Sequence, residues 1–338
     1  MTHVTQQISD DMLGRHLPPD GADESFQESW GFAWHDPERQ AGGIHHISYQ
    51  RNRGIADILS WIAYDGRIVG KARHFNVLSV DRDFPDWEAA GVAVRDVTAR
   101  SFGVHARTHV GGADVDLRFS GFTDPLMYDL DAEGATWGAH HYEVLGQVEG
   151  QVRLEGEPLP VSGFGWQDHS WGPRDMGHLL SHRWLLGIFG PDLFMSVMSI
   201  VTNRGPEPVL MGFVYDNGVI QAPTTLTFGA RISDDGCSPE ACDVRLTTDA
   251  SRDYRIVGDV QVTMPQAQRG GGGFWCVDGL STFDCDGRTG GGIFEISELR
   301  GPAPWHYADL GLTENGEVPA IPVREGSGAS SGQAPYRA

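Results

Sequence analysis

The densest group of chemically reactive side chains lies in GFGWQDHSWGPRDMG, residues 163–177. This stretch places Asp168, His169, Arg174 and Asp175 among two tryptophans and four glycines. A carboxyl group buried among aromatic rings has its ionised form disfavoured, so its pKa rises and it can deliver a proton. The stretch therefore predicts general acid–base chemistry, with Asp168 and His169 as the leading catalytic candidates.

The same stretch has a second interpretation, in which Asp168 and Arg174 form a buried ion pair with a purely structural role. Adjacent residues on a strand point to opposite faces, so only one of Asp168 and His169 can face a given cavity. A bulge or turn at Gly172 and Pro173 would change this relation. From the sequence both interpretations stay open.

Tryptophans near the reactive stretch, and earlier in ESWGFAWHDPE, can form the wall of a ligand site. Aromatic walls suit apolar ligands and can stabilise cationic intermediates by cation–π attraction. The alternative is that these rings fill the core. The candidate substrate-binding residues are Trp30, Trp34, Trp166, Trp171, Arg174 and Trp184.

Further acid–base candidates lie in two histidine pairs, in GGIHHISYQ and WGAHHYEVL. Alternation along a strand sends one residue of the first pair inward, and His45 is our candidate acid or base, with a hydrogen-bonded core histidine as the alternative. In the second segment His140 and Tyr142 share one face, and His141 lies on the other. We include His140 and Tyr142 as catalytic candidates, with a role in core packing as the alternative.

Metal and cofactor motifs are not recognisable. His178 and His182 would form a ligand pair on a helix, but HRWLLGIFG predicts a strand. The cysteine spacings do not match a zinc knuckle, although Cys276 and Cys285 could face each other across a hairpin. Nucleophile elbows, phosphate-binding loops and convincing dinucleotide fingerprints are missing. We therefore expect free thiols, no metal and no cofactor.

GFGWQDHSWGPRD resembles the Asp-His-x-Trp-Gly motif of the hydroxyneurosporene synthase family, which are carotenoid hydratases, and of their lipocalin-like relatives. ESWGFAWHDPE is similar to the opening of bacterial members of the same superfamily. The resemblance implies two lipocalin-like β-barrel domains with a ligand cavity. It also implies hydration, dehydration, cyclisation or ring closure without a metal or redox cofactor, although fold transfers better than reaction.

Short apolar runs separated by turn residues make up most of the chain and must position these side chains. This pattern predicts an all-β fold with few short helices. The pairs Asp65-Gly66 and Asn217-Gly218 predict tight hairpins. The best helix candidate is the short segment SDDMLGRHL near the start.

A loose internal repeat predicts two similar halves that meet near residue 175. We expect two tandem lipocalin-like β-barrel or sandwich domains, with chance similarity between glycine-rich β segments as the alternative. The expected parts are an N-terminal extension at 1–20, an N-terminal domain at 21–175, a C-terminal domain at 176–311 and a flexible tail at 312–338.

The charge balance excludes some classes of partner. With 25 basic and 46 acidic residues the formal net charge is −21, which argues against nucleic acid and anionic membrane surfaces. The sequence predicts neither a membrane-spanning segment nor a signal peptide. We expect a cytoplasmic protein, with a homodimer as one open possibility.

Together these observations predict a cofactor-independent lyase, hydratase, isomerase or cyclase. It would use general acid–base chemistry on a lipophilic or aromatic small molecule of terpenoid, polyketide or phenylpropanoid type. The alternative is a non-catalytic carrier of a hydrophobic ligand. A carrier needs an apolar pocket with at most one orienting group, whereas an enzyme needs several converging titratable groups.

Overall fold

The computed structural model describes residues 10–14, 16, 18, 21, 25–78, 87–89, 91–98, 100–108, 111–129, 139–174, 178–204, 208–234, 237–266 and 274–299. These residues belong to two compact units, one up to residue 174 and one from residue 178 onward. The predicted tail at 312–338 lies outside the described residues, as does most of the predicted extension at 1–20.

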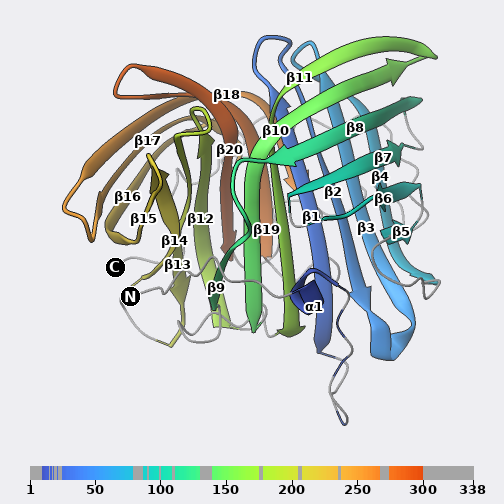
Figure 1. The fold of residues 1–338 in the computed structure, drawn as a ribbon, viewed down its shortest axis with the longest axis horizontal. Helices are drawn as coiled ribbons and strands as arrows, with labels where there is room; N and C mark the ends of the chain where they lie inside the picture. The colour runs from blue at the N-terminus through green and yellow to red at the C-terminus, as the bar shows by residue number, and fades with distance from the viewer. Residues whose placement is uncertain are drawn as a thin grey trace. The chain divides into compact units, whose positions relative to one another are not determined.

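The first unit contains an antiparallel sheet, here called the first sheet (Figure 1). Its order is β4-β3-β2-β1-β11-β10-β8-β7-β6-β5, and β9 pairs with β10. The bounds are β1 Phe26–Asp36, β2 Ala41–Gln50, β3 Ile55–Tyr64, β4 Arg67–Leu78, β5 Trp87–Ala89, β6 Val92–Arg95, β7 Ser101–Arg107, β8 Ala113–Gly121, β9 Leu126–Asp129, β10 His140–Leu154 and β11 Glu157–Pro173. The helix α1 spans Asp10–Leu13 and the 3-10 helix η1 spans Arg51–Arg53.

The second unit contains the second sheet, in the order β15-β14-β13-β12-β20-β19-β18-β17-β16. Its strands are also antiparallel to their neighbours. The bounds are β12 Leu179–Ile188, β13 Leu193–Thr202, β14 Val209–Asp216, β15 Val219–Gln221, β16 Pro223–Ile232, β17 Pro239–Thr248, β18 Asp253–Gln266, β19 Phe274–Cys285 and β20 Arg288–Leu299.

The two predicted hairpins are confirmed. Asp65 and Gly66 have φ values of 53° and 70°, and they join β3 to β4. Asn217 and Gly218 have φ values of 50° and 87°, and they join β14 to β15. Two successive positive φ values define the turn whose twist matches that of the flanking strands, which explains the choice of Asp-Gly and Asn-Gly.

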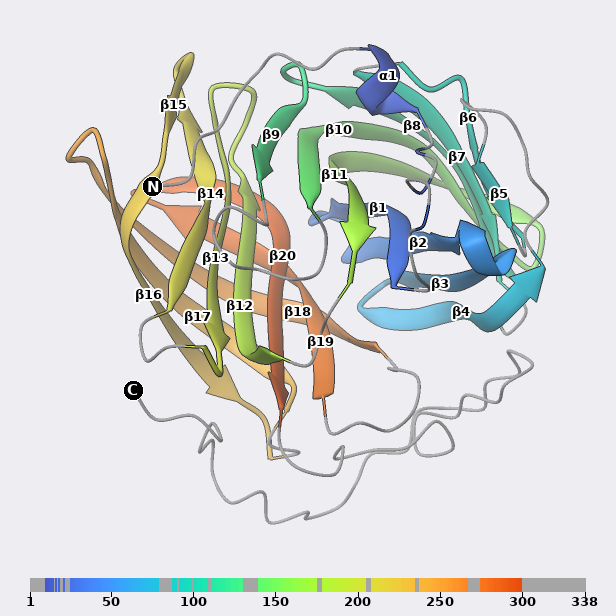
Figure 2. The same cartoon turned by 90° about the horizontal axis from the view of Figure 1, so that it is seen from below.

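The first sheet curls around an aromatic core (Figure 2). Alternation along β1 points Trp30, Phe32 and Trp34 to the face that we call the core face. Phe32 meets Phe102 edge-on at 5.2 Å and Phe119 at 5.7 Å, measured between ring centroids. Side chains from strands on both sides of the curl therefore pack against one another across the interior.

The opposite face of the first sheet, called the reverse face, carries the alternate residues of the same strands. Gly31 and Ala33 of β1 lie on it, next to Asp168 and Trp166 of β11. Trp166 is 8% exposed, so this part of the reverse face is buried too. Two buried faces explain why β1 has almost no exposed residue along its length.

The predicted all-β fold class is confirmed. Two curled antiparallel sheets account for the two units, and the single α-helix among the described residues is four residues long. It begins within the segment predicted to be helical. No helix in the described part of the chain is long and apolar enough to cross a membrane.

The aromatic core predicts a specific intolerance at Gly165. A Cβ atom there would lie 2.8 Å from Phe119 Cδ2 and 3.3 Å from Phe32 Cε2. Overpacking of this kind costs about 1–3 kcal/mol, so Gly165→Ala should lower the free energy of unfolding by that amount in urea titrations. Gly103→Ala is the control, because its nearest heavy atom would be 3.8 Å away. Equal stability of the two variants would contradict this packing.

Candidate functional site

Strand β11 carries the reactive stretch and runs between β1 and β10. Asp168 pairs with Gly31 on β1 and Glu143 on β10, whereas His169 pairs with Trp30 and Tyr142. The structure therefore places Asp168 on the reverse face and His169 on the core face. This confirms the expectation that these neighbours point to opposite sides.

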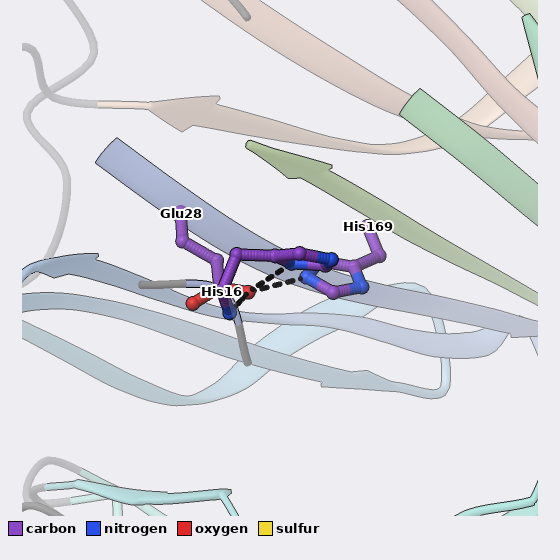
Figure 3. A group of neighbouring side chains, drawn as sticks. All are labelled: His16, Glu28 and His169. Atoms are coloured by element: carbon purple, nitrogen blue, oxygen red, sulfur yellow. Dashed lines mark hydrogen bonds and ion pairs between the residues drawn. The ribbon is translucent and has the colours of Figure 1, made fainter. Parts of the chain in front are cut away.

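On the core face, two imidazoles meet at one carboxylate (Figure 3). Glu28 Oε1 lies 2.9 Å from His16 Nδ1, 2.9 Å from His169 Nε2 and 2.8 Å from the backbone nitrogen of His16. His169 Nδ1 lies 3.1 Å from the Tyr142 hydroxyl. The result is a buried chain of polar contacts from Tyr142 through His169 to Glu28 and His16.

Electrostatics determine which side chains of this network carry a proton. Burial opposes ionisation of Glu28, but the hydrogen bonds from His16 and His169 outweigh it and lower the pKa of its carboxyl to about 2. Burial lowers the pKa of His169 and raises that of Tyr142, so both are neutral at pH 7. The Tyr142 hydroxyl then donates to His169 Nδ1, and His169 Nε2–H donates to the Glu28 carboxylate.

Aromatic stacking closes this network. The Trp171 ring stacks on His16 with a centroid distance of 3.8 Å and an interplanar angle of 6°. His16, Glu28 and His169 also have donor atoms within 4.8 Å of one another, and two histidines with one carboxylate are ligand types for zinc or iron. Here hydrogen bonds already join all three, so the network holds His16 against Glu28 of β1 and, through it, against His169 of β11.

On the reverse face, the Asp168 carboxyl lies over Gly31. A Cβ atom at Gly31 would be 2.0 Å from Asp168 Oδ1, so only glycine leaves room for this side chain. His141 Nδ1 lies 4.0 Å from Asp168 Oδ2, and His141 Nε2 lies 3.0 Å from Glu143 Oε1. Asp168, His141 and Glu143 therefore form a carboxyl–imidazole–carboxyl group.

Burial raises the pKa of Asp168 to about 6. The neighbouring Glu143 carboxylate raises it too, while His141, Arg174 and the hydrogen bond from the Gly31 backbone N–H act in the opposite direction. The Asp168 side chain is 14% exposed, so the carboxyl is mostly buried but still accessible to solvent. A carboxyl of this kind can both hold and release a proton near neutral pH.

Arg174 does not form the ion pair that was the alternative to catalysis. Its Nη2 donates to Ser170 Oγ at 2.8 Å, and among the described residues no guanidinium nitrogen lies within 4.0 Å of an Asp168 carboxyl oxygen. Burial lowers the pKa of Arg174 to about 10, so the guanidinium stays charged at neutral pH. Its Nε–H is buried and has no hydrogen-bond partner among the described residues.

An apolar row lies beside the Asp168 group on the reverse face. Trp166 precedes Asp168 by two residues on the same strand and therefore shares its face. Its cross-strand neighbours are Leu145 on β10 and Ala33 on β1. The row continues to Ile44 and Trp61 on β2 and β3. The reverse face thus combines titratable groups with a row of buried apolar side chains.

His45 and Trp34 form a separate pair in the core. Trp34 Nε1–H donates to His45 Nε2 at 3.1 Å, and His45 Nδ1 lies 2.9 Å from Ser60 Oγ. Burial lowers the pKa of His45 to about 3, so the ring is neutral at pH 7. These contacts give His45 the hydrogen-bonded core role that was its alternative.

The other predicted site residues are dispersed. Trp30 fills the core at 2% exposure, whereas His140 is exposed with its ring 5.2 Å from that of Trp171. Trp184 lies in the other unit, on β12, and donates to Ser196 Oγ at 2.9 Å. Asp175 lies outside the described residues. The structure thus joins Tyr142, His169 and Trp171 on the core face, and Trp166 and Asp168 on the reverse face.

Sequence reasoning missed His16, Glu28, Gly31, His141 and Glu143 as site residues. Glu28 shares the strand face of Trp30, and Glu143 that of His141, so alternation alone could have put each acid on its face. His16 gave no such signal, because its partner Glu28 is 12 residues away in the sequence and strand alternation does not relate the two. The importance of Gly31 depends on the register with β11.

The core-face network predicts an acid-sensitive contribution to stability. The folded protein holds the pKa of Glu28 at about 2 against 4.5, so the stabilisation is fully present above pH 4.5 and disappears as the pH falls toward 2. Glu28→Gln should therefore lower the free energy of unfolding by about 3 kcal/mol at pH 7 and by much less near pH 2. Urea titrations across this pH range measure the difference. Glu157→Gln, at an exposed glutamate of β11, should show no such trend, and a pH-independent loss in Glu28→Gln would contradict the network.

Two solved structures share the fold at low sequence identity. A candidate AttH protein from Nitrosomonas europaea is 15% identical, with a TM-score of 0.60 over 85% of this chain and 97% of that chain. Kievitone hydratase from Nectria haematococca is 11% identical, with a TM-score of 0.55 over 80% of this chain and 88% of that chain. Both are similar in architecture, which supports the lipocalin-like description of the two sheets.

No curated protein matches the sequence at a significant level. The resemblance to hydroxyneurosporene synthase stays a prediction, because none of these comparisons finds that family specifically. Residues 9–300 match the family described as a domain of unknown function, DUF7064. That match spans both sheets, so this chain belongs to the DUF7064 family.

Proposed function

We propose that this protein is a lyase of the hydratase type, or an isomerase or cyclase that uses the same chemistry, with Asp168 as the acid–base group. The observation that carries the proposal is the setting of Asp168. Its largely buried carboxyl has a pKa of about 6, contacts the His141 and Glu143 group, and lies beside an apolar row. Proton transfer in enzymes is most effective when the pKa of the group is near the working pH.

The proposed dehydration starts with proton donation from the Asp168 carboxyl to a substrate hydroxyl. The C–O bond breaks, water leaves, and His141 removes a proton from the neighbouring carbon, whose C–H electron pair forms the double bond. A final transfer from His141 to Asp168 restores both groups, so the cycle needs no net proton. Hydration follows the same steps in reverse, and protonation of an alkene without water addition would start isomerisation or cyclisation.

Glu143 and Arg174 support these steps. Glu143 accepts from His141 Nε2–H, which leaves Nδ1 as the basic nitrogen that faces Asp168. The Nε–H of Arg174 is a buried donor without a partner among the described residues, so it is available to a substrate oxygen that gains negative charge. These roles require only side chains of this chain.

The apolar row around Trp166 supports a lipophilic or aromatic substrate of phenylpropanoid, polyketide or terpenoid type. Kievitone hydratase, whose name gives a hydration activity, shares the fold over most of both chains. This likeness agrees with the proposed reaction class, but it carries no substrate over to this chain.

The carrier alternative fits the Asp168 group less well. A carrier needs an apolar pocket with at most one orienting group. Here several charged or titratable side chains lie close together, namely Asp168, His141, Glu143 and Arg174. Burying such groups is costly, so their convergence favours a catalytic role.

Replacement of Asp168 by asparagine separates catalysis from structural support. Loss of the proton donor should reduce kcat/KM by about 10²–10⁴-fold. For dehydration by the unmodified protein, kcat/KM should fall as the pH rises through about 6, the pKa of Asp168, because the protonated form is the donor in that direction. Turnover can be followed on a panel of phenylpropanoid, polyketide and terpenoid alkenes and alcohols in deuterium oxide, with mass spectrometry to detect deuterium on carbon.

Asp168→Asn should lose activity without losing free energy of unfolding at pH 7. The folded state raises the pKa of Asp168 from 3.8 to about 6, so it binds this proton more tightly than the unfolded chain does. Stability from this group is therefore present below pH 3.8 and lost by pH 6, at a cost of up to about 3 kcal/mol at pH 7. Asp168→Asn should be as stable as the unmodified protein at pH 7, or more stable. A strongly destabilised variant that keeps its activity per folded molecule would refute the acid–base role.

Gly31→Ala tests the position of the carboxyl while keeping it. The added Cβ would overlap Asp168 Oδ1 at 2.0 Å and force the carboxyl to move. We expect a loss in kcat/KM and a shifted pH profile in this variant. Asp116→Asn, at an exposed position on β8, is the control and should change neither. An unchanged rate and pH profile in Gly31→Ala would contradict the role of Asp168.

A further inference from the structure

In the second sheet, four side chains with metal-binding atoms converge on one face. Cys276 and Asp278 of β19 and Glu295 of β20 each place a thiol or carboxylate atom within 4.8 Å of the other two. His182 of β12 adds its Nε2 at 3.0 Å from Glu295 Oε1. We call these four residues the Cys276 cluster.

Strand register brings the cluster together. Cys276 pairs with Ser297, which pairs with His182, and Asp278 pairs with Glu295. The strands β12, β20 and β19 are neighbours within the sheet, so rigid backbone supports every donor. All four side chains are buried, with residue exposures between 2% and 7%.

Ser297 orients the histidine. His182 Nδ1 is hydrogen-bonded to Ser297 Oγ, and this contact points Nε2 toward Glu295. Histidines that bind metal usually have their second ring nitrogen fixed in this way by a hydrogen bond. The arrangement therefore contains both the donor atoms and the contact that holds one of them in place.

The types of donor atom in the Cys276 cluster indicate which metal ion it would bind. Asp278 and Glu295 lie directly opposite each other on adjacent strands, where like charges repel. A divalent cation between them would turn this repulsion into coordination. Thiolate and imidazole ligands suit zinc, whereas calcium and magnesium prefer sites made of oxygen alone.

We propose that Cys276, Asp278, Glu295 and His182 form a zinc-binding site in the second sheet. Cys276, Asp278 and Glu295 supply three ligands, and His182, whose Nε2 contacts Glu295, would complete a tetrahedral coordination sphere by turning toward the ion. The ion would then tie β12, β20 and β19 together. The acid–base proposal for Asp168 does not depend on this site. Its donors come from three strands, which explains why cysteine spacing gave no metal signal.

The remaining cysteines do not share this environment. Cys285 lies on the same strand as Cys276, so the hairpin pairing left open from the sequence is wrong, and all four cysteines are free thiols. Cys242 lies on β17 and packs in the core cluster of the second unit. It is therefore a matched control for Cys276.

Cobalt(II) is the probe, added to the full-length protein after metals have been removed by a chelator. We expect one equivalent to bind and give a thiolate-to-cobalt charge-transfer band that zinc abolishes by competition. Cys276→Ala should lose the band, and Cys242→Ala should keep it. Ser297→Ala should keep the band with about 10–100-fold weaker binding, because only the orienting hydrogen bond is lost.

Glu295→Gln guards against a folding defect in Cys276→Ala. It keeps the thiolate, so it should show the band only at higher cobalt concentration, and zinc should raise its melting temperature less than that of the unmodified protein. Absence of stoichiometric binding, or a band that survives in Cys276→Ala, would overturn the proposal. Turnover is not measured, so either outcome leaves the Asp168 proposal untouched.

Discussion

The register of β11 against β1 and β10 is the constraint on which the candidate site depends. It sets Asp168 opposite Gly31, the only residue that leaves room for the carboxyl, and opposite Glu143. A one-residue shift would exchange the faces of every side chain on the strand and bring His169 to the reverse face. The environment that raises the pKa of Asp168 is therefore a property of strand pairing as much as of the local motif.

The carboxyl groups on the two faces of β11 have pKa values shifted in opposite directions, because different side chains surround them. On the core face, hydrogen bonds from His16 and His169 outweigh burial, so the Glu28 carboxylate stays ionised and locks the network. On the reverse face, burial outweighs the attraction of His141 and Arg174, so Asp168 keeps a proton to higher pH. Adjacent positions on one strand thus supply a structural anchor and the proposed acid–base group.

Much of this arrangement follows from local sequence rules, because alternation and turn chemistry act over a few residues. The all-β fold, the turns at Asp65-Gly66 and Asn217-Gly218, and the opposite orientations of Asp168 and His169 were predictable in this way. Contacts between distant strands were not, since they depend on register. Examples are Glu28 with His169, 141 residues apart, and His182 with Ser297, 115 residues apart. Aromatic residues were ambiguous for another reason: tryptophan suits a core and a ligand wall equally well, and burial alone separates them.

In the folded chain, we infer, the Asp168 carboxyl exchanges its proton near neutral pH. The most direct test is a carbon-detected NMR titration of the aspartate carboxyl signals in the full-length protein, with Asp168→Asn to assign the resonance. We expect a midpoint near pH 6 for Asp168. A midpoint near 4, the ordinary value for an exposed aspartate, would contradict it.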